Sequence, residues 1–138
     1  MQFTVETDDR LTCVDVTDRV AATVDEMLPT TEKTPDAALC TVFVQHTTAG
    51  VIVQEPESRL LGDVETFLCD LVPDRDGYAH DEIDDNADSH LRATLLGESV
   101  SVPVREGELA LGRWQLIQLV ECDGPRRRTV EVVVTPAL

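Results

Sequence analysis

The chain has 138 residues and a formal net charge of −16, because 27 acidic side chains face 11 basic ones. A surface this negative repels phosphates, which excludes nucleic acid as a general partner. No apolar run approaches the roughly 20 residues of a membrane-spanning helix, and the start, MQFTVETDD, lacks the basic and apolar segments of a secretory signal. We therefore expect one domain over residues 1–138, in a cytoplasmic protein with no membrane partner.

The acidic excess also indicates a halophilic protein. At 1 M salt the Debye length is about 3 Å, so self-repulsion between surface charges is largely screened. A single lysine, Lys33, stands against ten arginines, as expected of a chain that avoids lysine on an acidic surface. The alternative is a solvated, charged surface with no particular adaptation to salt.

The first third of the chain predicts strands and one helix. Alternating apolar residues predict strands over 2–7 and 11–16, and a helix follows over 19–28, which Pro29 ends. The apolar segments 38–45 and 51–54 then predict two strands that form a hairpin around the TTAG turn.

The middle of the chain predicts two helices separated by a long acidic loop. Helical spacing of apolar residues extends over 58–72. Residues 73–90 are polar and acidic, and a loop of this length inside a domain is usually functional or disordered. A short helix over 86–97 has Asn86 as its cap and Gly97 as its end.

The last third is rich in predicted strands. These cover 99–105, 108–111, 113–122 and 129–136, and the Asp-Gly turn between the last two predicts an antiparallel hairpin. The fold class is therefore α+β, a single compact domain with a mostly antiparallel sheet and two to three helices.

The three histidines are the first candidates for chemistry. His46 ends a strand at a turn, His80 lies in the acidic loop, and His90 is on the short helix. A catalytic zinc site needs three such ligands and an open position for water. The irregular spacing matches no local metal motif, so ordinary surface or hydrogen-bonded histidines remain the alternative.

Other polar residues near these positions suggest anion binding. Thr47 and Thr48 can cradle a phosphate or simply close a hairpin. Glu55 follows the next strand and can act as a general base or as a partner of an imidazole.

The last third adds one cationic cluster and one polar pocket candidate. Arg126 and Arg128, with Arg127 between them, form the one concentrated cationic cluster. They either bind an anion or pair with nearby carboxylates. In the predicted strand 113–122, Gln115 can turn into a pocket, and Trp114 is expected in the core or an interface.

Several spaced motifs resemble one known family. They are QHTTAG at 45–50, Tyr78–Ala79–His80, NADSHL at 86–91, GELALGRWQ at 107–115 and ECDGPR at 121–126. In this order they resemble the YjbQ-like family, described as secondary thiamine-phosphate synthases, over roughly residues 3 to 135. The main departure is Ser89, where the family more often has a small apolar residue.

The resemblance implies a homotrimer with pockets associated with the subunit interfaces. It places His46, His80 and His90 in a metal or active site, and Glu55, Asn86 and Arg126 also match. The implied reaction is thiamine-phosphate synthesis, in which a thiazole phosphate displaces pyrophosphate from a pyrimidine-methyl diphosphate. The implied cofactor is a divalent metal, zinc or similar, or magnesium with the substrate pyrophosphate.

Two other functions remain open at the level of sequence. One is a metal-dependent hydrolase of a small phosphorylated substrate, in which metal-bound water is the nucleophile. The other is a non-catalytic trimeric module that binds a metal or an anion. The catalytic candidates are His46, Glu55, His80, Asn86 and His90, and the substrate-binding candidates are Thr47, Thr48, Gln115, Arg126 and Arg128.

Overall fold

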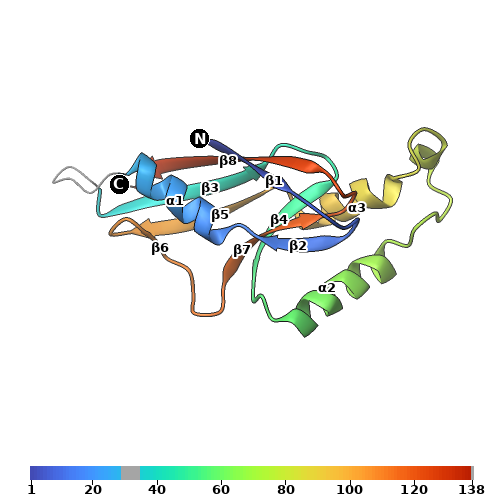
Figure 1. Cartoon of the computed structure of the whole chain (residues 1–138), viewed down its shortest axis with the longest axis horizontal. Helices are drawn as coiled ribbons and strands as arrows, with labels where there is room; N and C mark the ends of the chain where they lie inside the picture. Colours follow the sequence, from blue (N-terminus) through green and yellow to red (C-terminus); the bar gives the residue numbers. More distant parts are fainter. Residues whose placement is uncertain (29–34, 138) are drawn as a thin grey trace.

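Two antiparallel sheets organise the molecule (Figure 1). The computed structural model of the chain describes residues 1–28 and 35–137, so the predicted helix end at Pro29 lies outside the described residues. The larger sheet has the order β1 (Gln2–Glu6), β8 (Arg127–Pro136), β3 (Ala37–Val44), β5 (Ser99–Arg105) and β6 (Glu108–Leu109). The smaller sheet has the order β2 (Thr12–Asp15), β7 (Leu116–Glu121) and β4 (Ala49–Gln54).

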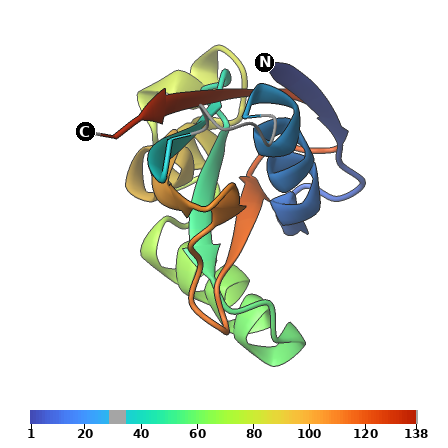
Figure 2. The same cartoon turned by 90° about the vertical axis from the view of Figure 1, so that its left-hand side faces the viewer.

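Three α-helices accompany the sheets within residues 1–28 and 35–137, in agreement with the predicted two to three. Helix α1 (Thr17–Met27) buries Val20 and Val24 in the core, and α3 (Ala87–Leu96) packs on β4. Helix α2 (Ser58–Leu71) buries only Leu68 and lies apart from β8 and both termini (Figure 2). A short 3₁₀ helix, η1 (Ala79–Glu82), interrupts the acidic loop. No helix in the described part of the chain is long and apolar enough to cross a membrane.

The core lies between the two sheets and α1. Alternate residues of β3, from Ala38 to Val44, are buried, which is the period of a strand with one face turned inward. They meet buried residues of β4, β7 and β8 such as Val51, Ile117 and Val132. The predicted α+β class with mostly antiparallel strands is therefore confirmed.

Both predicted hairpins are wrong, because each pair of strands is divided between the sheets. β3 pairs with β5 and β8, whereas β4 pairs with β7. Likewise β7 lies between β2 and β4, while β8 lies between β1 and β3. Nearly every residue of β7 is buried, so it requires a partner strand on each edge and cover on both faces. The turns at 45–48 and 122–126 are consequently corners where the chain crosses from one sheet to the other.

Three such corners meet at one end of the molecule. Glu6 pairs with Arg127 at the end of β1, and both Thr12 of β2 and Ala49 of β4 pair with Glu121. The corner between β1 and β2 therefore lies beside the corner from β3 to β4 and the corner from β7 to β8. The three crossings bring segments from the beginning, middle and end of the sequence together.

Gly50 allows α3 to approach this end closely. A Cβ atom at this position would lie 2.7 Å from Leu96 Cβ and 2.8 Å from the backbone oxygen of Gly97. Both atoms belong to the end of α3, and the Val51 amide donates to the same Gly97 oxygen at 3.2 Å. The glycine of TTAG thus admits a helix rather than a ligand.

We expect Gly50→Ala to lower the free energy of unfolding by about 1–3 kcal/mol, because the added methyl group overpacks a contact with backbone. Urea denaturation measures the change. Gly62→Ala is the matched control, because a Cβ on this glycine of α2 would meet nothing within 4 Å. That substitution should stabilise the protein through helix propensity. Equal stability of the Gly50→Ala variant and wild type would contradict the close packing of α3.

Candidate functional site

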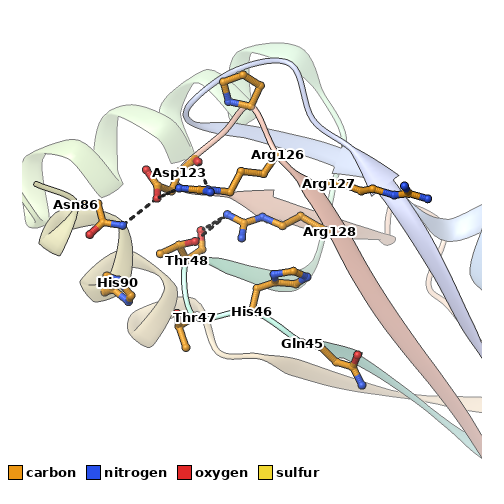
Figure 3. Close-up of a pocket in the computed structure, with 11 residues that line it drawn as sticks. Gln45, His46, Thr47, Thr48, Asn86, His90, Asp123, Arg126, Arg127 and Arg128 are labelled. Carbon is orange, nitrogen blue, oxygen red and sulfur yellow. Dashed lines mark hydrogen bonds and ion pairs between the residues drawn. The ribbon is translucent and has the colours of Figure 1, made fainter. Parts of the chain in front are cut away.

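Two of these corners, at 45–48 and 122–126, line a cavity of about 650 Å³ together with residues of α3 (Figure 3). The cavity is lined by the turn 45–48, by Asn86 and His90 of α3, and by Asp123 with the segment 125–128. Two segments predicted from sequence to carry chemistry, QHTTAG and ECDGPR, therefore meet in one place. We call this space the corner cavity.

A buried ion pair supports the floor of the corner cavity. Arg128 is 2% exposed and Glu121 is fully buried. Arg128 Nε donates to Glu121 Oε1 at 2.9 Å, and Arg128 Nη2 donates to the other carboxylate oxygen. The Thr7 hydroxyl donates to Oε1 at 2.6 Å, and the Asp123 amide donates to Oε2 at 3.0 Å. Burial raises the pKa of Glu121, but the hydrogen bonds from Arg128, Thr7 and Asp123 outweigh it and hold the pKa below its ordinary value.

Arg128 also ties the corners together. Its Nη2 donates to the backbone oxygen of Thr48 at 3.0 Å and to the Thr48 hydroxyl at 2.8 Å. The expected role of Arg128 as a ligand-binding residue needs correction, since most of its donors are used within the protein. The alternative open at the level of sequence, that the arginines pair with carboxylates, is the one Arg128 follows. Thr48 accepts from Arg128, so its own hydroxyl proton remains available to donate.

His46 is fixed as a neutral imidazole with a defined tautomer. Its Nε2 accepts a hydrogen bond from the Thr129 amide at 2.8 Å, so the ring proton is on Nδ1. Partial burial lowers the pKa of His46, and the positive charges of Arg128 and Arg126 lower it further, although Glu121 opposes them.

A hydrogen-bonded chain connects the 3₁₀ helix to the arginine at the cavity edge. His80 Nε2 donates to Asn86 Oδ1 at 3.1 Å, and Asn86 Nδ2 donates to Asp123 Oδ2 at 2.9 Å. Arg126 Nη2 donates to the same carboxylate oxygen at 2.9 Å, and Arg126 Nε donates to the Asp123 backbone oxygen at 2.8 Å. The two hydrogen bonds to Asp123 fix the edge of the Arg126 guanidinium group that carries Nε and Nη2. The rings of His80 and His90 touch edge to face, with centroids 4.7 Å apart.

The cap of α3 differs from the prediction. Asn86 occupies the capping position, but its side chain makes no capping hydrogen bond. Instead, Asp81 of η1 accepts from the Ala87 amide at 2.9 Å. Because Asp81 caps the helix, the Asn86 side chain is available for its hydrogen bonds with His80 and Asp123.

The three histidines do not fit a shared metal site. No group of three His, Cys, Asp or Glu side chains within residues 1–28 and 35–137 is arranged to hold a metal ion. The lone pair of His46 Nε2 is occupied by the Thr129 amide, and binding a metal through Nδ1 would require loss of the remaining ring proton. His46 and His90 line the corner cavity, whereas His80 lies behind His90.

Glu55 and Gln115 do not reach the corner cavity. Glu55 directly follows the last residue of β4, and His46 lies three positions before its first, so the length of the strand, about 16 Å at ~3.3 Å per residue, separates them. Gln115 is at the same far end, because Gln54 pairs with Leu116. Its side chain accepts from the Gly112 amide at 2.7 Å. Strand β7 begins only at Leu116, and Trp114 is 62% exposed rather than in the core.

Two site residues were missed at the level of sequence. Asp123 anchors Arg126, and Glu121 anchors Arg128. A signal was present, because Glu121 is a carboxylate inside the apolar run LIQLVEC, where only a partner makes its burial tolerable.

Comparisons with known proteins agree over the whole chain. The family profile described as "UPF0047 protein YjbQ-like" matches residues 1–137. A UPF0047 protein of Archaeoglobus fulgidus is 45% identical over 132 residues, which is 96% of this chain and 98% of the relative. A crystal structure of a hypothetical protein from Aeropyrum pernix K1 has a TM-score of 0.90 and 39% identity, covering 99% of this chain and 98% of that one. A YbjQ-like protein of unknown function from Sulfolobus solfataricus has a TM-score of 0.87 and 37% identity, covering 98% and 94%.

These comparisons correct the predicted activity. The matching profile and the relative from Archaeoglobus fulgidus carry a family designation that names no reaction, and the Sulfolobus solfataricus protein is described as of unknown function. Thiamine-phosphate synthesis therefore has no support beyond the motifs that suggested it. The metal-dependent hydrolase loses its basis as well, because the three histidines do not form the ligand set that it requires.

We expect Glu121→Gln to lower the free energy of unfolding by about 3–5 kcal/mol, because Arg128 would stay buried without its counter-charge. Urea denaturation at neutral pH measures the loss. The matched control is Glu6→Gln on β1, whose carboxylate is 78% exposed and only 3.8 Å from Arg127, and it should change stability little.

The same pair predicts a pH dependence. Because the folded pKa of Glu121 is lowered, its contribution is complete above the unfolded value of about 4.3 and is lost as pH falls through the folded value. The difference between wild type and Glu121→Gln should therefore shrink in acid. A difference that is small at neutral pH, or that grows in acid, would contradict the role of the pair.

Proposed function

This chain belongs to the UPF0047 family of YjbQ-like proteins, and we propose that its corner cavity binds a small phosphorylated molecule. The observation that carries the proposal is the position of Arg126. Asp123 engages its Nε and Nη2, and the side chain is 52% exposed at the cavity edge. Its Nη1 has no acceptor among the described residues, so one edge of an aligned guanidinium group remains available to an anion.

The charge of the corner cavity supports an anionic ligand. Three arginines and one aspartate line it, in a chain whose net charge is −16. Arg127 points away from the other lining residues, so Arg126 supplies the accessible charge and Arg128 adds to the positive potential from below (Figure 3). A local patch of positive electrostatic potential on an acidic protein attracts small anions, while the remaining negative surface repels large ones such as nucleic acid.

The neutral groups of the cavity are donors. The hydroxyl of Thr48 keeps its proton for a ligand because its oxygen accepts from Arg128. The tautomer of His46 provides an Nδ1–H. Phosphate oxygens only accept hydrogen bonds when they are fully ionised, so a set of donors beside a guanidinium group suits them.

His90 adds a group that can exchange a proton with the ligand. It lines the corner cavity, and its ring nitrogens make no hydrogen bond to any described residue. An imidazole nitrogen can donate to or accept from a phosphate oxygen, so His90 adds a group suited to acid–base chemistry on a phosphorylated molecule.

We expect Arg126→Ala to weaken the binding of inorganic phosphate about ten- to hundredfold, because charge-assisted hydrogen bonds contribute about 1.5–3 kcal/mol. Isothermal titration calorimetry at constant ionic strength measures the dissociation constant. Arg59→Ala is the matched control, because it removes the same charge from a side chain of α2 that is 90% exposed and lies outside the cavity. Equal weakening in both variants would mean that the loss of one positive charge, and not the position of Arg126, causes the effect. An absence of phosphate binding in wild type would contradict the proposal.

We also propose that the chain assembles as a homotrimer, the state that its family resemblance implies. Leu39 of β3 and Val133 of β8 are 42% and 46% exposed on the outer face of the larger sheet, which gives that face apolar groups for association. Sedimentation equilibrium should give three times the chain mass of 15.2 kDa. Val133→Glu should reduce that mass, and a monomeric wild-type protein would contradict the assembly.

The halophilic character is a further proposal, based on the 27 acidic side chains against 11 basic ones. We expect the midpoint of thermal unfolding to rise by several degrees between about 0.1 M and 1 M KCl, because the Debye length falls from about 10 Å to about 3 Å and self-repulsion is screened. Calorimetry at both salt concentrations measures the shift. A midpoint that stays constant or falls with added KCl would contradict adaptation to salt.

A further inference from the structure

A second cavity of about 550 Å³ adjoins the corner cavity. The two share four lining residues, Gln45, His46, Thr47 and His90, so one wall divides them. In the view of Figure 3, Thr47 lies between His90 and His46, the two ring-bearing residues of this wall. The combined space exceeds what a bare phosphate ion would occupy, since sites for small organic molecules are usually ~300–1,000 Å³.

The second cavity has a different chemical character. Phe43, Val44, Ala49 and Ala93 are among its lining residues, and no arginine is. Its one charged lining residue is Glu98, whose backbone oxygen accepts from the Val44 amide at 2.8 Å. We call it the apolar cavity. It attracts an uncharged apolar group and repels a second anion at its Glu98 end.

We propose that the ligand is the phosphate ester of a compact apolar alcohol with a single anionic end. Its phosphate lies in the corner cavity beside Arg126, and its apolar body lies in the apolar cavity against Phe43. The link between the two passes the shared wall of His46, Thr47 and His90. This inference rests on the proposed function and adds to it the class of molecule that carries the phosphate.

The position of Phe43 favours this arrangement. The residue is at the end of β3 next to the QHTTAG corner, and its ring is 40% exposed, so one side remains uncovered for a ligand. Covering such an aromatic face with an apolar ring removes water from both surfaces and is favourable. The phosphate is held by charge, and the apolar body then decides which phosphate ester binds.

The test compares two probes, inorganic phosphate and benzyl phosphate, by calorimetry on the full-length protein. Wild type should bind benzyl phosphate at least about tenfold more tightly than inorganic phosphate, because burial of the ring adds apolar contact. Phe43→Ser should reduce this ratio of dissociation constants toward one. Phe67→Ser is the matched control, because it makes the same change on α2, at a residue that is 61% exposed and does not line the apolar cavity. It should keep the wild-type ratio.

A second variant places charge in the apolar cavity. Thr94→Glu changes an exposed lining residue of α3, so it should fold normally and should also lower the ratio. Equal binding of both probes to wild type would overturn this inference and leave phosphate binding standing. A ratio that survives both Phe43→Ser and Thr94→Glu would also overturn it. Failure of wild type to bind either probe would overturn the proposed function and this inference together.

Discussion

The buried pair of Glu121 and Arg128 is the constraint on which the rest of the corner cavity depends. Glu121 receives hydrogen bonds from Arg128, from Thr7 at the end of β1 and from the Asp123 amide. Arg128 continues to Thr48. One carboxylate and one guanidinium group thus join all three corners. Because a buried ion pair offers little net stability relative to apolar residues, its value here lies in fixing where three chain segments meet.

Charge is distributed in two layers around this pair. The lower layer is neutralised inside the protein, where the carboxylate of Glu121 and the guanidinium group of Arg128 satisfy each other. The upper layer is Arg126 with Asp123. Asp123 accepts hydrogen bonds from one edge of the Arg126 guanidinium group, and the other edge is left for the cavity. A rigid lower layer keeps the upper one in place. His46 belongs to both layers, because β8 fixes its ring while its Nδ1–H remains free to donate.

Local patterns in the sequence predicted the elements well and their pairing poorly. The spacing of apolar residues located the helices, as in α1, which buries Val20 and Val24 four positions apart. Neighbouring strands with a turn between them predicted hairpins. In the structure β7 pairs with β2 and β4 and not with β8, and the alternation of apolar residues does not show which strands pair. The site followed the same rule. The motifs flanking the corners contain His46, His90 and Arg126, which line the cavity and whose roles stay predictions. Glu55 lies far from them, because β4 leads away from the cavity and pairs with β7 instead of β3.

The corners also determine when the cavity can exist during synthesis of the chain. Thr7 and Glu121 are 114 positions apart, and Arg128 lies beyond both. Contacts this distant in sequence form late, because their loop must be closed before they contribute. A ribosome-bound chain that has exposed only α1, β3 and β4 has the threonine turn but no arginine beneath it. The corner cavity, which needs both the threonine turn and Arg128, is therefore complete only in the finished chain.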